Sequence, residues 1–327
     1  MEHIDDSVEK WLMNFRSPKT QRSYRHWFQK FQAFAKKTPK QLLDMIDRQE
    51  GGRLQVDDLT KQFYNQLLTD GYPSCSAYIA LVSTRSFFKY RAERKLPPLP
   101  EAYAPPAEPA FEQRRVLTTE DFQKMLKKAE TPFEELVLWM LGDGGQRRAI
   151  YTGLKLKHLK GSLLQDTPVV VTVPSELPDY RGINIAKKRR KFSHRFGFTA
   201  GTVNRLLEHL EQRRKEGEKT TGESWLLLAE HGKPPSADRI NRIVERTAKA
   251  AGIQKTVHSK KRGRIRAIHA HIFRDHLNNR LKAIGETDDI LRNMILGHRP
   301  PYAGAYDRYT DERILETYLK LSIVATS

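Results

Sequence analysis

Residues 271–309, HIFRDHLNNRLKAIGETDDILRNMILGHRPPYAGAYDRY, form the stretch on which the fold of this chain depends. His271 and Arg274 are three positions apart, so they share one face of a predicted helix. A second predicted helix follows and ends at Gly297, directly before His298. The stretch therefore gathers two imidazoles and a guanidinium in a short helical segment.

Tyr306 and Tyr309 follow and add phenol groups to this segment. Arginine offers an anion a planar fork of donors, and histidine exchanges a proton near neutral pH. With a phenol, these groups suit an anionic centre attacked by an oxygen nucleophile, and phosphate is the natural anion. A single His-x-x-Arg pair is often a solvated helix face, and Leu-Gly-His is often a helix end. The order of the motifs along the chain must therefore decide whether these residues form a reactive site.

Composition indicates a protein that binds a polyanion. The 327 residues are enough for two domains, and 58 Lys and Arg against 39 Asp and Glu give a net charge of +19. No apolar run is long enough to span a membrane, and residues 1–10 do not resemble a signal peptide, so we expect a cytoplasmic, nucleoid-associated protein. Cys75 is the only cysteine, which excludes an intrachain disulfide and a cysteine-based zinc site.

Residues 1–104 are expected to form a helical domain. Ser17 and Pro18 predict the start of a helix. Aromatic residues then recur at helical spacing and are expected in the core rather than on a base-stacking surface: Tyr24, Trp27, Phe28, Phe31 and Phe34. Basic residues on a later helix are candidates for phosphate contacts: Arg85, Lys89, Arg91, Arg94 and Lys95.

Prolines between positions 97 and 109 predict a break in regular structure, with a linker at residues 105–114 and a second domain at residues 115–327. Helix starts in this second domain are predicted from capping residues: Thr118, Thr131, Thr202, Ser236, and Thr287 or Asp288. A last helix from residue 311 could pack on its own chain or on a neighbouring protomer.

Three runs predict a small antiparallel sheet in this mainly helical chain: residues 169–173, 183–186 and 192–198. The last two runs flank a turn rich in cations: Lys187, Lys188, Arg189, Arg190 and Lys191. Residues 255–266 carry six Lys or Arg and are expected to form a loop or strand on a nucleic-acid backbone. Within them we expect backbone contacts from Lys260, Lys261, Arg262 and Arg264.

The chain thus carries, in order, an Arg after a Gly-rich break, a Lys-bearing hairpin, His-x-x-Arg, Leu-Gly-His and then Tyr. This order resembles the tyrosine recombinase (phage integrase) family, and the resemblance extends from Ser17 to Tyr318. It implies an N-terminal helical, SAM-like core-binding domain and an α+β catalytic domain. It also implies a catalytic set: Arg147, Lys188, His271, Arg274, His298 and Tyr306.

Two segments could supply the first catalytic arginine. Residues 152–155 look like the family's Thr-Gly-Leu-Arg signature but place Lys155 where Arg is required, and lysine cannot grip a phosphate with two parallel bonds. Aligning residues 145–147 with the signature keeps the arginine and selects Arg147. Ile150 then stands where the family usually has an acidic residue that orients this arginine, so another group must take that role.

The general acid and the nucleophile each have a rival. The family places one lysine of the hairpin in the minor groove, and we favour Lys188 over Lys187; alternation along a strand lets only one reach the phosphate. Tyr306 follows His298 by eight residues, a spacing that resembles archaeal-type integrases, whereas Tyr309 follows by eleven. We favour Tyr306, with Tyr309 as packing and Tyr302 as an outsider.

The resemblance implies a site-specific recombinase that forms a 3′-phosphotyrosine link and exchanges strands in a tetramer on double-stranded DNA. Its partners would be a specific DNA site, further copies of the chain and possible accessory DNA-bending proteins. We expect no metal, no ATP and no other cofactor. The alternatives are a type IB topoisomerase-like strand nicker and a DNA-binding relative without catalysis, to which the residue at position 150 points.

Overall fold

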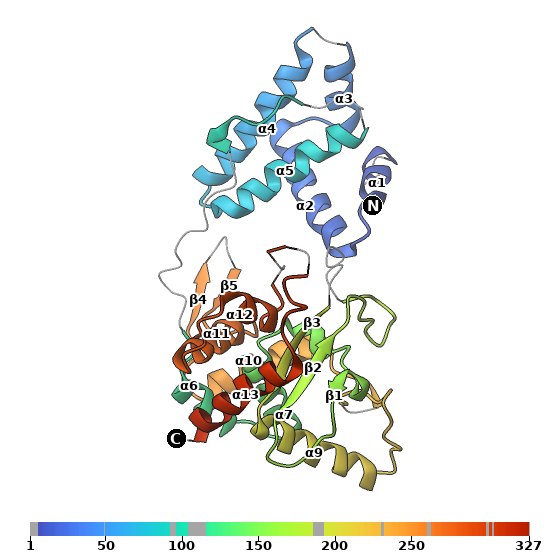
Figure 1. Cartoon of the computed structure of the whole chain (residues 1–327). Coiled ribbons are helices and arrows are strands. Elements are labelled where there is room, and N and C mark those ends of the chain that lie inside the picture. Colours follow the sequence, from blue (N-terminus) through green and yellow to red (C-terminus); the bar gives the residue numbers. More distant parts are fainter. Residues whose placement is uncertain are drawn as a thin grey trace. The chain divides into compact units, whose positions relative to one another are not determined.

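The computed structural model describes residues 6–48, 50–91, 96–103, 116–185, 193–229, 232–259, 263–298, 301–302 and 304–326. The chain divides into two compact units, unit 1 with residues 1–112 and 258–265, and unit 2 with residues 113–257 and 266–327. Helices dominate, and the strands form a three-stranded antiparallel sheet and a separate pair (Figure 1). The predicted fold class, mainly helical with a small antiparallel sheet, is confirmed.

Unit 1 is a helical bundle. Its helices are α1 (Asp6–Met13), α2 (Pro18–Ala35), α3 (Pro39–Arg48), α4 (Gly52–Thr69), α5 (Ser74–Arg91) and the short η1 (Glu101–Tyr103). The predicted start of α2 is confirmed, because the Ser17 side chain accepts a hydrogen bond from Thr20 N. Helix α5 packs against α1, α2 and α4 and so forms the centre of the bundle.

Aromatic rings fill the core of unit 1. Trp11, Phe28, Phe31 and Phe87 are buried, and the ring centroids of Phe28 and Phe87 are 4.3 Å apart. Removing such a side chain from water stabilises the bundle by roughly 1.5–3 kcal/mol. The prediction that the aromatic stripe of α2 is core is confirmed.

Arg85 was predicted as a phosphate contact, but its side chain is largely buried and is used inside unit 1. Its guanidinium pairs with Asp57, whose side chain is only 2% exposed, and donates to the backbone carbonyl of Pro97. A buried carboxylate needs a cation, and α4 and α5 lie side by side, so the arginine is used inside the unit. It fastens the start of the proline-rich segment to the bundle.

Unit 2 contains most of the remaining elements. Its helices are α6 (Thr119–Leu126), α7 (Pro132–Gly144), α8 (Arg148–Tyr151), η2 (Leu156–His158), α9 (Ala200–Lys215), α10 (Ala237–Ala250), α11 (Ile272–Ala283), α12 (Asp289–Ile295) and α13 (Asp311–Thr326). Its strands are β1 (Leu159–Lys160), β2 (Val169–Val173) and β3 (His194–Phe198). The separate pair β4 (Thr256–Ser259) and β5 (Gly263–Arg266) includes residues of both units.

The sheet of unit 2 has the order β1-β2-β3, and Val171 pairs with both Leu159 and Phe196. The predicted third strand at 183–186 is therefore wrong for the part that the structure describes: residues 183–185 form only an isolated bridge, between Asn184 and Pro178. The Asp179 carboxylate accepts hydrogen bonds from the backbone N–H groups of Arg181 and Ile183, and these bonds close a local turn. The segment folds back on itself instead of joining the sheet.

Side-chain caps begin several helices of unit 2 as predicted: Thr118, Thr131, Ser236 and Asp288 accept from backbone N–H groups of α6, α7, α10 and α12. The expected start of a helix at Thr202 is wrong. Helix α9 begins at Ala200, and the Thr202 side chain is buried and donates to Asp143 over 2.6 Å. A buried carboxylate, rather than the helix end, uses this hydroxyl.

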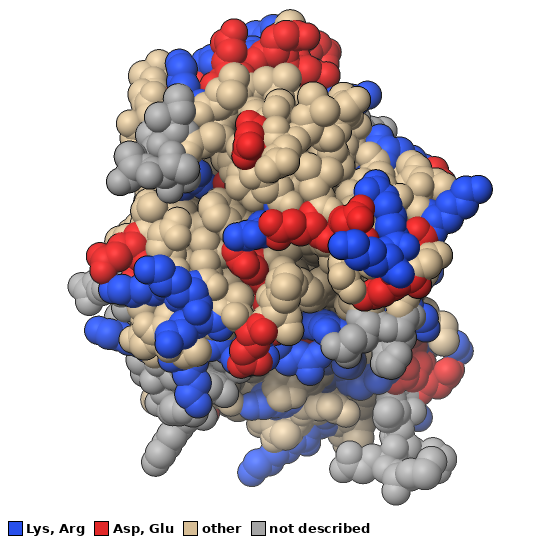
Figure 2. Space-filling view, turned by 90° about the horizontal axis from the view of Figure 1, so that it is seen from below, with Lys and Arg blue, Asp and Glu red and all other residues tan. Residues whose placement is uncertain are grey.

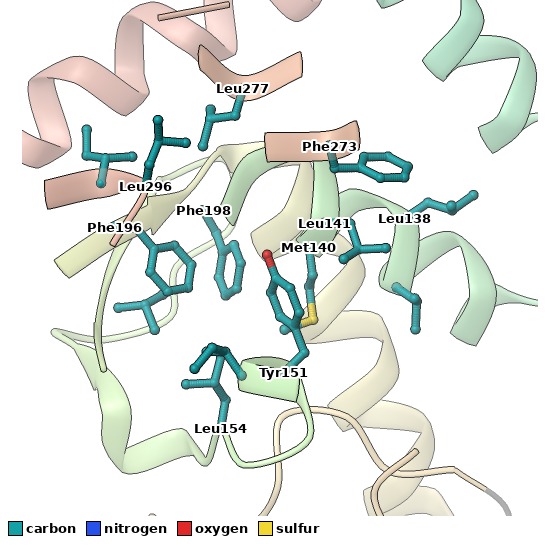
Figure 3. Packing of buried hydrophobic residues seen from close by; sticks show 14 of the residues in the cluster. Leu138, Met140, Leu141, Tyr151, Leu154, Phe196, Phe198, Phe273, Leu277 and Leu296 are labelled. Atoms are coloured by element: carbon teal, nitrogen blue, oxygen red, sulfur yellow. The ribbon is translucent and has the colours of Figure 1, made fainter. Parts of the chain in front are cut away.

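One apolar core connects the elements around α7. Figure 3 shows Met140 and Leu141 of α7 beside Tyr151 of α8 and Phe198 of β3, with Leu277 of α11 close by. Helix α13 packs on β2, β3, α9 and α11 of its own chain (Figure 1). In this single chain the last helix thus packs in cis, which is one of the two arrangements that the sequence left open.

Candidate active site

The turn that carries Arg147 is fixed by its neighbours. Helix α7 ends at Gly144, and Gly145 takes the left-handed conformation with φ 54°, which glycine adopts without strain. The Tyr151 hydroxyl accepts a hydrogen bond from Gln146 N over 3.1 Å. Arg147 then stands at the start of α8, half-buried, with its position set by the chain on both sides.

Gln146 is a site residue that the sequence did not reveal. Its side chain is 3% exposed, and its Nε2 donates to the carbonyls of Gly144, at 2.8 Å, and Ile295, at 2.6 Å. Its Oε1 lies 3.0 Å from Nε2 of His194 on β3. One buried amide thereby joins the end of α7, the end of α12 and the sheet. The only signal in the sequence was a long polar side chain between Gly145 and Arg147.

Arg274 links the arginine turn to the Leu-Gly-His turn. It lies in the first turn of α11, is 6% exposed, and its Nη1 is 3.3 Å from the carbonyl oxygen of Gly145. Its Nε donates to Nε2 of His298 over 3.3 Å. The structure therefore brings together three of the predicted motifs that are far apart in the sequence.

His298 is held from both sides of its ring. Because Nε2 accepts from Arg274, the ring proton is on Nδ1, which lies 2.6 Å from Oδ1 of Asn293. The backbone N–H of His298 also donates to the Asn293 carbonyl, at the left-handed turn of Gly297. Asn293 is a second residue of the site that the sequence did not reveal.

His271 lies at the N-terminal end of α11 and is exposed. The loss of solvent around its ring lowers the pKa of His271, and the charges of Arg274 and Arg147 lower it further, against the opposing effect of Asp275. A lowered pKa keeps this imidazole neutral at pH 7. It can therefore accept a proton there.

The two candidate tyrosines have different partners. Tyr306 is 6% exposed, and its hydroxyl donates to the backbone carbonyl of His298 over 2.9 Å. The Tyr309 hydroxyl donates to Oδ2 of Asp288 over 2.6 Å, while Oδ1 of the same carboxylate caps α12. Arg308 contacts the Tyr309 hydroxyl as well. Tyr309 is thus built into the start of α12, whereas Tyr306 lies at the histidine.

The predicted general acid and most predicted DNA contacts lie outside the described residues: Lys187, Lys188, Arg189, Arg190, Lys191, Lys260, Lys261 and Arg262. Of Arg264 only the backbone, in β5, is described. Their roles stay predictions.

Ile150 is buried in the core around α7, so apolar packing fills the position of the expected carboxylate. The nearest buried carboxylate along the chain, Asp143, accepts from Thr199 and Thr202 and pairs with Arg280 at 3.0 Å. It anchors α11, the helix of Arg274, rather than the arginine turn.

Charged residues of both signs are scattered among uncharged ones on the face that Figure 2 shows. Within the described ranges, His, Cys, Asp and Glu side chains form no group of three that could hold a metal ion. The same ranges contain no helix long and apolar enough to cross a membrane.

Solved structures with the same arrangement of elements establish the class of fold: the chain has the fold of the tyrosine recombinases and integrases. The Tn1549 transposon integrase in complex with transposon right-end DNA is 15% identical over 94% of this chain and 95% of that chain, with a TM-score of 0.61. A lambda integrase dimer bound to a COC′ core site is 14% identical over 95% and 96%, with a TM-score of 0.55.

A lambda integrase tetramer bound to a Holliday junction is 16% identical, covering 93% of this chain and 76% of that chain, with a TM-score of 0.53. No protein-family model matches the chain, and no curated protein matches it by sequence.

Proposed function

We propose that this chain is a site-specific DNA recombinase that cuts and rejoins DNA strands through a covalent 3′-phosphotyrosine link. The observation that carries the proposal is the convergence at His298: its ring accepts from Arg274 over 3.3 Å, and its backbone carbonyl accepts from the Tyr306 hydroxyl over 2.9 Å. A buried guanidinium, an imidazole and a phenol thus meet at one residue, and these groups suit catalysis on a phosphate.

The proposed chemistry transfers a phosphoryl group from a DNA oxygen to a phenol. The Tyr306 oxygen attacks the phosphorus, the bond from phosphorus to the 5′-oxygen breaks, and a 3′-phosphotyrosyl strand and a 5′-hydroxyl result. His271 takes the phenol proton, and Lys188 gives a proton to the leaving oxygen. Arg147 and Arg274 stabilise the charge that builds on the nonbridging oxygens. The reverse steps with a second strand rejoin the DNA, and the covalent link keeps the energy of the phosphodiester.

One pKa shift and one hydrogen bond support these roles. The lowered pKa of His271 supports its role as proton acceptor. The bond from Tyr309 to Asp288 supports Tyr306 as the nucleophile, because the Tyr309 hydroxyl is engaged by the cap of α12. The role of Lys188 as general acid is supported by the sequence alone.

The assembly is part of the proposal. Residues 1–104 would be the core-binding domain, 105–114 the linker and 115–327 the catalytic domain, and a tetramer would hold two double-stranded DNA sites. The lambda integrase tetramer on a Holliday junction is similar in fold and supports this assembly. The protein would act on DNA in the cytoplasm, and accessory DNA-bending proteins would assist it.

A trapped covalent adduct tests the proposal. Duplexes that the protein binds are first selected from a random-sequence library and then nicked next to each candidate cleavage position, so that a released fragment prevents rejoining. We expect a protein–DNA adduct on a denaturing gel with the wild type and with Tyr309→Phe, and none with Tyr306→Phe.

The other outcomes decide between the alternatives. Loss of the adduct only in Tyr309→Phe would move the nucleophile and leave the reaction class intact. Specific binding without any adduct would favour a non-catalytic DNA-binding protein, as the buried Ile150 suggests. An adduct without exchange between two intact duplexes would indicate a strand nicker of the type IB topoisomerase kind.

A further inference from the structure

Arg195 on β3 contacts the segment that carries both tyrosines. Its Nη1 donates to Oδ1 of Asp311 over 2.8 Å, and its Nη2 donates to the backbone carbonyls of Tyr306, at 3.3 Å, and Tyr309. The Arg195 side chain is 23% exposed. One guanidinium thus holds the turn around the tyrosines and the first turn of α13 at the same time.

The chemistry of these contacts suits a rigid clamp. A guanidinium is planar and has five donors in fixed directions, so it can hold two carbonyls and a carboxylate without rearranging. Asp311 keeps the guanidinium in place, and bonds from a charged donor are stronger than bonds between neutral groups. The backbone of the tyrosine turn is therefore tied to the sheet at both ends.

The position of Arg195 in the sheet gives the clamp its importance. Neighbouring residues of a strand point to opposite faces. His194 points to Gln146 in the arginine turn, with 3.0 Å between His194 Nε2 and Gln146 Oε1, while Arg195 points to the tyrosine turn. Two adjacent residues of β3 therefore connect the turn of Arg147 with the turn of Tyr306.

We propose that Arg195 is a positioning residue for the nucleophile: it fixes the turn of Tyr306 on β3, with Asp311 orienting the guanidinium. This inference rests on the proposed function, because it assigns Arg195 a role in attack by Tyr306. Arg195 acts through the backbone of the tyrosine turn and contacts no DNA in this role.

The first measurement needs no DNA. Hydrogen–deuterium exchange of peptides covering residues 304–310 is compared among wild type, Arg195→Gln, Arg195→Lys and Asp311→Asn. The matched control is Arg205→Gln, which removes the ion pairs of Arg205 with Glu135 on α7 and with Glu208 on α9. Loss of several charge-assisted bonds should speed exchange in Arg195→Gln by about tenfold or more, whereas the control should leave these peptides unchanged. Unchanged exchange in all three variants would overturn the clamp.

The second measurement separates positioning from binding. Single-turnover formation of the trapped adduct and the dissociation constant for the same duplex are measured for each folded variant. We expect Arg195→Gln to slow adduct formation by about tenfold or more with unchanged DNA affinity, and Arg195→Lys and Asp311→Asn to be slowed less because part of the contact set remains. Faster exchange with a wild-type rate of adduct formation would refute the role of Arg195.

The two parts of the experiment keep the proposals distinguishable. If the wild type forms no adduct, the proposed function fails and the positioning role falls with it. If the wild type and Arg205→Gln react while none of the clamp variants is slowed, the proposed function stands and only the role of Arg195 is lost. If Arg195→Gln does not fold, Asp311→Asn and Arg195→Lys decide both measurements.

Discussion

Arg274 donates from Nε to Nε2 of His298, and the other ring nitrogen of His298 lies 2.6 Å from Asn293 Oδ1. An acceptor at Nε2 and a donor at Nδ1 define one neutral tautomer of the imidazole. The ring is therefore held between a buried cation and the side chain of a residue on α12. Asn293 is five residues from His298, on the helix that the Leu-Gly-His turn ends.

Asn293→Ala should slow covalent adduct formation without changing DNA affinity. The substitution removes the acceptor at Nδ1, so the ring of His298 loses one of the two bonds that orient it. A lost hydrogen bond of this kind corresponds to about a tenfold lower rate. Single-turnover trapping measures the rate, with Asn279→Ala on the exposed face of α11 as the control. Equal rates for the two variants would show that Asn293 does not orient the ring.

Tyr309→Phe should lower the free energy of unfolding by roughly 1–3 kcal/mol. It removes the hydroxyl that donates to Asp288 and leaves a partly buried carboxylate with one partner fewer. Urea denaturation measures the change. Tyr302→Phe is the matched control, because Tyr302 is 56% exposed and its hydroxyl should contribute little. Similar stabilities for the two variants would contradict a structural role for Tyr309.

Local signals explain what the sequence could predict. The pairing of His271 with Arg274 on one helix, the capping side chains and the left-handed glycine at 297 each depend on residues a few positions apart. The apolar and aromatic stripes also follow from helical spacing. These signals located the helices and the two turns that hold Arg274 and His298.

Contacts between distant residues explain what the sequence could not predict. Gln146 meets Ile295 across 149 positions, and Arg195 meets Asp311 across 116. Strand β1 was not predicted, because its two residues are too few to show an alternating pattern. Residues 183–186 were predicted as a strand instead, because they contain β-branched residues. The turn held by Asp179 outweighed that preference.

The free energy of unfolding should fall as pH is lowered from about 6.5 to about 4 because His276 is buried. Burial lowers its pKa to about 4 and Arg280 adds to this, although the bond from Nδ1 to the Leu117 carbonyl and the charge of Asp143 oppose the shift. Between these pH values the unfolded chain binds the extra proton, so acid favours unfolding. The stability that neutral His276 preserves is fully present above about pH 6.5, the pKa of histidine in the unfolded chain.

The difference between the folded and unfolded pKa values of His276 sets the size of this pH effect on stability. The difference between 6.5 and about 4 corresponds to roughly 3 kcal/mol. Urea denaturation at pH 7 and at pH 5 should show a smaller loss of stability in His276→Gln than in the wild type. His209, whose pKa burial also lowers to about 4, titrates in the same window, so His209→Gln is the parallel variant. An identical pH dependence in wild type and His276→Gln would exclude His276 as a cause.

Gly297→Ala should destabilise the protein more than Gly285→Ala. Both glycines have positive φ, at 62° and 78°, so both substitutions carry the cost of about 1–2 kcal/mol for a left-handed alanine. A Cβ at Gly285 would meet nothing within 4 Å, whereas one at Gly297 would press on the His194 ring and the Gln146 amide. Crowding should add about 1–3 kcal/mol in urea denaturation. Equal losses would mean that these side chains move aside freely.

The rate of adduct formation at subsaturating DNA should fall in acid, with a midpoint below the ordinary histidine pKa of about 6.5. Such rates report the free protein, in which the loss of solvent around the ring and the charges of Arg274 and Arg147 lower the pKa of His271. A proton acceptor must be neutral, so activity is lost as pH falls through the folded pKa. The decline should approach about tenfold per pH unit for a single proton.

His271→Gln assigns this acid limb to its residue. The variant should be slower at pH 7 and should show a flatter profile below pH 6.5, because its amide does not titrate. Asp275→Asn is the complementary variant: the Asp275 carboxylate raises the pKa of His271, so its removal should move the limb to lower pH. An unchanged limb in His271→Gln would mean that another group takes the tyrosine proton, whereas a shift in Asp275→Asn would tie the limb to the imidazole at the start of α11.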